Sequence, residues 1–81
     1  MPVFYFDVAF AGRLFRDEEG QNLFDAAAAE TEAIHAAADI AREVLPKRAA
    51  EVLEVHLHDE RRARLLDVTV AIQVKKAVAE G

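Results

Sequence analysis

The stretch DAAAAETEAIHAAADIAREVL, residues 25–45, predicts one long helix around which the rest of the chain is arranged. Asp25 is a favourable N-cap, because its carboxylate can accept hydrogen bonds from free backbone N–H groups of the first turn. The alanines that follow have the highest intrinsic helix propensity. Pro46 ends the helix, because the residue before a proline is driven out of the α region and the ring blocks continuation.

Helical spacing places the apolar side chains of this segment on one stripe, which we expect to be buried. The stripe consists of Ala26, Ala27, Ala33, Ile34, Ala37, Ile40, Ala41, Val44 and Leu45. Small side chains let the helix axis approach a sheet closely. The large side chains of the core must therefore come from the flanking segments.

Two segments with strand-like alternation precede the helix and two follow it. We predict strands over residues 3–10, 13–17, 51–59 and 64–74. In the first of these, Phe4, Phe6 and Phe10 point to one face and supply the bulk that the helix lacks. This order predicts a single α+β domain over residues 1–81, a ββαββ unit in which one helix packs on one face of a four-stranded antiparallel sheet.

The first hairpin is expected to turn at residues 11–12, which places Phe15 opposite Val8 and Arg16 opposite Asp7. In the second hairpin, keeping both apolar faces on the core predicts three opposite pairs: Leu57 with Leu66, Val55 with Val68, and His56 with Asp67. The last strand outruns its partner. Residues from Ala71 onward are therefore free to pair elsewhere, for example with a second chain, and residues 75–81 form a strand-like, helical or frayed tail.

Length and composition limit the classes of function. A chain of 81 residues makes one small domain with a thin core, and it has no cysteine for a disulfide framework or a thiolate metal site. Scaffolds of this kind often gain stability by self-association, so we predict a homodimer. The start carries no signal-peptide pattern and no apolar stretch approaches membrane-spanning length, which predicts a cytoplasmic protein without a membrane partner.

The residue inventory also argues against catalysis. The chain has no serine, and its glycines stand only at positions 12, 20 and 81. Hydroxyl nucleophiles for a triad reduce to Thr31 and Thr69, neither of which has a convincing base, and no phosphate-binding loop is present. We predict no enzymatic activity and no cofactor.

A candidate metal site lies on the polar face of the second hairpin. His56 and His58 project from one strand to the same face, and Asp67 is expected opposite His56. Two imidazoles and a carboxylate are suitable ligands for zinc or iron. The competing interpretation is an ordinary half-exposed sheet face, in which polar residues recur at every second position.

A candidate surface for nucleic acid or an acidic partner is the basic tip of the same hairpin, formed by Arg61, Arg62 and Arg64. Arginines of this kind contact phosphate backbones. A net charge of −5 opposes general nucleic-acid binding. The aromatic ladder of sheet-based RNA binders is missing, so a solubilising turn is the competing interpretation.

Several short motifs follow one another along most of the chain. They are Met1-Pro2 with the aromatic strand Phe4-Tyr5-Phe6-Asp7, the turn Asp17-Glu18-Glu19-Gly20, the alanine-rich helix and the closing hairpin. In this order the chain resembles a family of short bacterial proteins known as a domain of unknown function. Members of that family tend to have proline where Phe24 stands and a glycine where Arg61-Arg62 stands. The resemblance implies this fold and brings no activity, cofactor or catalytic residue.

A fainter similarity connects the chain with small antitoxin proteins, which also place an acidic glycine turn ahead of an alanine-rich helix packed on a sheet. The hypothesis from the sequence is therefore a non-catalytic interaction or oligomerisation module, an antitoxin-like or regulatory accessory protein with an unidentified protein partner. The alternative is a binding protein that uses the polar sheet face for metal or nucleic acid.

Overall fold

One antiparallel sheet with a helix on one face accounts for all the elements of the computed structural model, which describes residues 1–48 and 50–78. In chain order the elements are β1 (Val3–Phe10), β2 (Arg13–Phe15), β3 (Gln21–Asn22), α1 (Ala26–Val44), β4 (Val52–His58) and β5 (Arg64–Ala71). The strands are arranged in the order β2-β1-β4-β5, and β3 pairs with β1 beyond the end of β2. The predicted α+β class is confirmed, and β3 is a short fifth strand that the prediction did not contain.

The helix begins and ends where its caps predict. Asp25 Oδ1 accepts a hydrogen bond from the Ala28 N–H at 2.8 Å, and the last helical residue is Val44. The buried face is a row of alanines at a spacing of four residues, Ala29, Ala33, Ala37 and Ala41. The predicted stripe was wrong at its N-terminal end and at Ile34, which is 49% exposed, because the alanine row sets the closest approach of α1 to the sheet.

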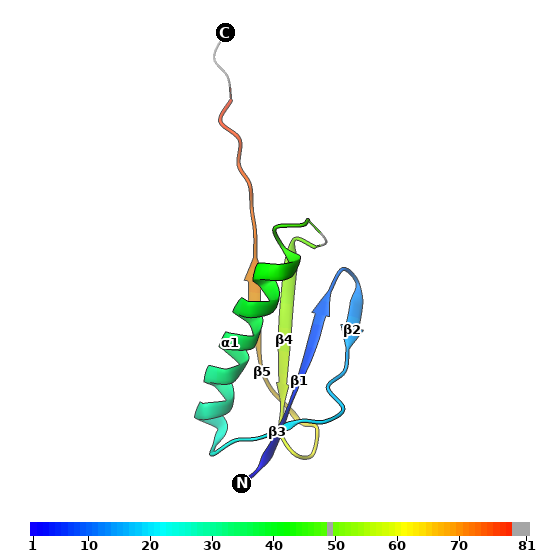
Figure 1. Ribbon diagram of the computed structural model, residues 1–81, viewed down its shortest axis with the longest axis vertical. Coiled ribbons are helices and arrows are strands. Elements are labelled where there is room, and N and C mark those ends of the chain that lie inside the picture. The colour runs from blue at the N-terminus through cyan, green and yellow to red at the C-terminus, as the bar shows by residue number, and fades with distance from the viewer. Residues whose placement is uncertain (49, 79–81) are drawn as a thin grey trace.

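The sheet supplies the bulk of the core. Its buried large side chains are Phe4, Phe6, Leu53, Val55 and Leu57. Burying one such side chain contributes about 1.5–3 kcal/mol, far more than an alanine does, so the stability of the domain depends mainly on β1 and β4. α1 lies over β4 and β5, and the β1–β2 hairpin stands beside it (Figure 1).

The strand registers agree with the alternation in the sequence. The three predicted pairs of the second hairpin and the Val8–Phe15 pair of the first are all present. The predicted Arg16–Asp7 pair was wrong because β2 ends at Phe15, two residues before its predicted end. Arg16 Nε lies 3.9 Å from Glu18 Oε1 instead.

The chain leaves the sheet at Ala71, three residues before the predicted end of the last strand. Residues 72–78 are extended and continue away from the domain in the direction of β5 (Figure 1). The remainder of the predicted tail, residues 79–81, lies outside the described residues. Across the described part of the chain, no helix combines the length and the apolar composition needed to cross a membrane.

Candidate functional site

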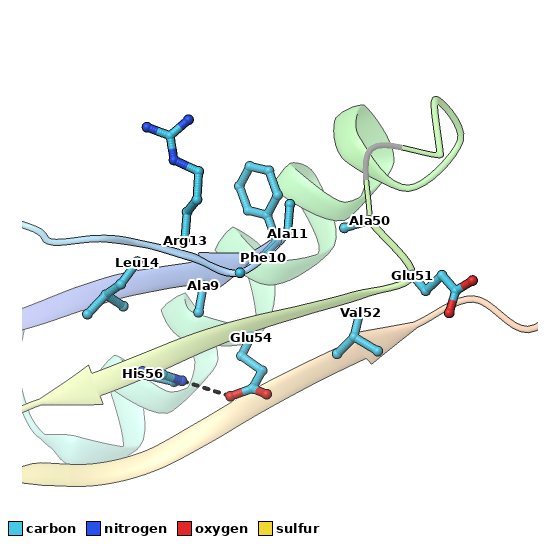
Figure 2. A pocket seen from close by; sticks show the side chains of 11 residues that line it. Ala9, Phe10, Ala11, Arg13, Leu14, Ala50, Glu51, Val52, Glu54 and His56 are labelled. Atoms are coloured by element: carbon cyan, nitrogen blue, oxygen red, sulfur yellow. Dashed lines mark hydrogen bonds and ion pairs between the residues drawn. The ribbon is translucent and has the colours of Figure 1, made fainter.

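The metal-ligand cluster on the polar sheet face differs from the predicted set. Glu54, His56 and Asp67 each offer one ligand atom, and these atoms lie within 4.8 Å of one another. His56 Nε2 is 2.8 Å from Glu54 Oε1 (Figure 2). His58 does not join the cluster, because its Nδ1 is directed toward Asp7 Oδ2 at 3.7 Å. The structure thus brings together two of the three predicted ligands, and Glu54 takes the place of His58.

The Arg64 guanidinium already pairs with the Asp67 carboxylate of this cluster. Arg64 Nε and Nη2 donate to the two oxygens of Asp67, each at 2.7 Å. These hydrogen bonds, with the charge of Arg64 behind them, lower the pKa of Asp67 below its ordinary value. A metal ion at this cluster would therefore compete with the Arg64 guanidinium for Asp67.

An open depression of about 610 Å³ adjoins the cluster, between the β1–β2 hairpin and β4. Ala9, Leu14 and Val52 supply apolar surface, and Glu54 and His56 supply its hydrogen-bonded polar pair (Figure 2). None of the described residues that line it carries a hydroxyl, a thiol or a primary amine. The depression therefore offers contacts for binding and lacks these usual nucleophiles of covalent catalysis.

A second polar network connects β1 and the Asp17 turn with the turn between β4 and β5. Asp7 is buried, with 6% of its surface exposed, and its Oδ1 accepts the Asp17 N–H at 2.9 Å. Arg62 Nη1 lies 3.4 Å from the same oxygen. The Arg62 guanidinium also stacks on Tyr5, 3.9 Å from the ring centroid, and donates to the Asp17 carbonyl at 2.5 Å. Arg62 therefore neutralises a buried carboxylate and fixes the position of the Asp17 turn.

The Asp17 carboxylate completes this network from the other side. It accepts hydrogen bonds from the backbone N–H groups of Phe6, Glu19 and Gly20 at 3.0–3.1 Å. Partial burial acts to raise the pKa of Asp17, but these three hydrogen bonds and the charge of Arg62 outweigh it, so the pKa lies below its ordinary value. Asp17 is therefore held ionised as a cap for the β1 backbone.

The three predicted arginines differ in the groups that they contact. Arg62 is engaged with Asp7, Asp17 and Tyr5, and Arg64 is engaged with Asp67. Arg61 is exposed on the tip of the hairpin. Arg62 also has a positive φ of 65°, a region that favours glycine, at the turn where the resembling family tends to have one. Arg62 thus links two distant parts of the chain, whereas Arg64 forms an exposed ion pair within its own strand.

Comparison with known proteins identifies one family. The sequence model of the family described as Domain of unknown function (DUF6894) matches residues 3–71, the span from the start of β1 to the end of β5. No curated protein and no solved structure matches the chain significantly. The match confirms the resemblance to an uncharacterised family and brings with it no activity, ligand or partner.

Proposed function

We propose that this chain, which belongs to the DUF6894 family, is a non-catalytic module that self-associates through the free edge of β5. The form of that edge is the observation that carries the proposal. Among the described strands, β5 has a neighbour only on the β4 side, and residues 72–78 prolong it beyond the domain (Figure 1). A free strand edge presents unpaired N–H and C=O groups, which readily pair with a strand of another chain.

Exposed apolar side chains continue along the extension. Ile72 is 45% exposed and Val74 is 67% exposed. They follow Val68 and Val70 in the alternation, and those two residues pack against the core on the side of α1. A second strand beside β5 would cover this row without any rearrangement of the domain, so burial of apolar surface favours association.

Nothing in the composition of residues 64–78 interrupts strand pairing. The segment contains neither proline nor glycine, so every residue retains its N–H donor and none loosens the backbone. Because the family match ends at Ala71, the extension lies beyond the matched domain. We therefore propose this mode of association for this chain and not for the family as a whole.

The test is the mass of the protein in solution, measured by sedimentation equilibrium over a dilution series. Val74→Lys places a charge on the extension, and Leu14→Lys is the matched control, because Leu14 is 60% exposed on β2 at the opposite edge. We expect dimers for the wild type and Leu14→Lys, and monomers for Val74→Lys. A monomeric wild type, or a Val74→Lys protein that dimerises as well as the control, would overturn the proposal.

A second candidate function is binding of a divalent metal ion by Glu54, His56 and Asp67. The observation that favours it is the convergence of their ligand atoms within 4.8 Å on neighbouring strands. Titration with zinc, followed by calorimetry, tests it. We expect His56→Ala to abolish the binding heat and Arg64→Ala to strengthen binding, because the competing cation is gone. Equal heats for the wild type and His56→Ala would exclude the site.

A further inference from the structure

We infer that two copies of this chain pair their β5 strands antiparallel about a two-fold axis at Ala71, so that residues 72–78 of each copy lie beside residues 64–70 of the other. This inference rests on the proposed self-association and specifies its geometry. Closed two-fold symmetry is the commonest arrangement of identical subunits, and it makes every contact reciprocal, so that only a residue on the axis faces its own copy. Hydrogen-bond phase limits the allowed registers, and the matching of side chains selects this axis among them.

The hydrogen-bond phase of β5 excludes half of the registers. The Ile72 N–H donates to the Glu51 carbonyl at 3.0 Å, in continuation of the β4–β5 ladder. Backbone groups of alternate residues in an antiparallel ladder point to the same side, so those of Asp67, Thr69 and Ala71 point to the free edge. Two β5 strands joined at this edge must therefore place odd-numbered residues opposite odd-numbered residues.

The extension is long enough to reach along β5 when the axis is at Ala71. Residues 64–70 and residues 72–78 lie on the two sides of Ala71. The seven residues on either side of it each span about 23 Å at strand geometry. Each extension therefore covers the free edge of the other copy along the whole length of β5.

The polar side chains distinguish this register from its neighbours, whereas apolar pairs on the α1 face occur in all of them. On the α1 face the pairs are Val70 with Ile72 and Val68 with Val74; on the polar face they are Thr69 with Gln73 and Asp67 with Lys75. Opposite charges and apolar pairs directly across a ladder are favourable. A shift of two residues in one direction places Arg64 opposite Lys76, and a shift in either direction removes the lysine from Asp67.

This pairing gives the extension a place in a continuous sheet. Ile72 and Val74 of one copy contact Val70 and Val68 of the other, and the extension becomes an added edge strand of the other sheet. The principal dimensions of the single chain, 62 × 23 × 19 Å, reflect how far the extension protrudes. A helix of 19 residues accounts for only about 28 Å of that length.

Disulfide trapping in a chain that has no cysteine of its own tests the register. The variants are Thr69→Cys, Ala71→Cys and Gln73→Cys, oxidised in parallel. Residue 71 faces its own copy at a Cα separation of about 5.5 Å, within disulfide range, whereas two copies of residue 69 lie about 13 Å apart. We expect Ala71→Cys to form linked dimers at least about tenfold faster than either other variant.

A mixture of the Thr69→Cys and Gln73→Cys proteins should give a linked heterodimer, because these positions face each other. Fastest linkage at 69 or 73 alone, or equal rates at all three positions, would overturn the register. Sedimentation of the same variants separates the two proposals. If the variants are dimers with a different linkage pattern, only the register fails; if the unmodified chain is a monomer, the proposed function fails too.

A charge substitution provides a second readout in which the fold is unaffected, since both lysines are exposed. Lys75→Glu places a carboxylate opposite Asp67, and Lys76→Glu, opposite Leu66, is the matched control. We expect Lys75→Glu to raise the dimer dissociation constant about three- to fivefold relative to Lys76→Glu. Equal dissociation constants for the two variants would contradict the Asp67–Lys75 pair.

Discussion

The two edges of the sheet differ in how their backbone groups are satisfied. At the β2–β3 edge the strands are only 3 and 2 residues long. The Asp17 carboxylate fills the gap between them and accepts the Phe6 N–H that a longer strand would have paired. At the other edge β5 has 8 residues, and the described chain provides no strand and no capping side chain beyond it.

This contrast shows that a free edge can be closed by side chains as well as by a strand. Soluble proteins commonly protect their edges with short strands and inward-pointing charges, and the β2–β3 edge has both, since Asp7 points into the protein. β5 has neither. The proposed self-association would pair the exposed backbone groups of β5 with a strand of a second copy.

The largest expected effect comes from removing the Asp17 carboxylate, which caps β1 at the β2–β3 edge. Asp17→Ala removes the acceptor for Phe6, Glu19 and Gly20, and hydrogen bonds to a charged group are worth about 1.5–3 kcal/mol each, so we expect a loss of about 3 kcal/mol in the free energy of unfolding. Urea denaturation measures it. Glu18→Ala, the neighbouring exposed carboxylate, is the control and should change stability by less than about 0.5 kcal/mol. Equal losses would contradict the edge-closing role.

Removing the Arg62 guanidinium at the β2–β3 edge should have the next largest effect. Arg62→Ala leaves the buried Asp7 without its guanidinium and exposes Tyr5, so we expect a loss of about 2 kcal/mol in urea denaturation. Arg61→Ala changes the same charge one residue away on the exposed tip and should be nearly neutral. If the two variants are equally stable, Arg62 contributes only to surface charge.

Alanine substitutions at Gly12 and Gly20 compare backbone strain alone with backbone strain plus steric crowding. Both have positive φ, 72° at Gly12 and 73° at Gly20, so alanine at either position costs about 1–2 kcal/mol in backbone strain. A Cβ on Gly20 would also lie 2.7 Å from Val3 Cγ1 and 3.0 Å from the Phe4 carbonyl, whereas one on Gly12 meets no atom within 4 Å. Thermal denaturation should therefore show Gly20→Ala less stable than Gly12→Ala by about 1–2 kcal/mol.

The smallest expected effect is a pH dependence of the closed edge. Because the pKa of Asp17 is lower in the folded protein than in the unfolded chain, its stabilisation is fully present above about pH 4 and is lost as the pH falls through the folded value. The difference in unfolding free energy between the wild type and Asp17→Asn should therefore shrink on acidification below about pH 4. A difference that stays constant down to pH 2 would contradict the lowered pKa.

Sequence patterns predicted the elements whose contacts are local or periodic. The helix from its cap at Asp25, and the pairing of Leu57 with Leu66, depend on spacing that can be read along the chain. The metal cluster was predicted only in part. His56 and Asp67 are opposite by register, but alternation alone does not distinguish His58, which is directed toward Asp7, from Glu54, which bonds His56.

The polar network behind β1 was missed because its members are far apart in the sequence. Arg62 and Asp7 are 55 residues apart, and Asp17 and Phe6 are 11 apart. The one signal in the sequence was a lone carboxylate, Asp7, in an aromatic strand. A carboxylate at such a position must find a partner when buried, but the identity of the partner depends on how the hairpins fold together.

The sequence by itself determined the class of fold, the helix and the register of both hairpins, because periodic burial and turn chemistry act over a few residues. Only the tertiary structure decided which histidine joins Glu54 and which arginine neutralises Asp7. It also decided that β2 and β5 are the edge strands and that the Asp17 carboxylate caps β1 next to β2. Those outcomes depend on side chains that meet across the sheet, and the satisfaction of their hydrogen bonds is settled only when all the strands are in place.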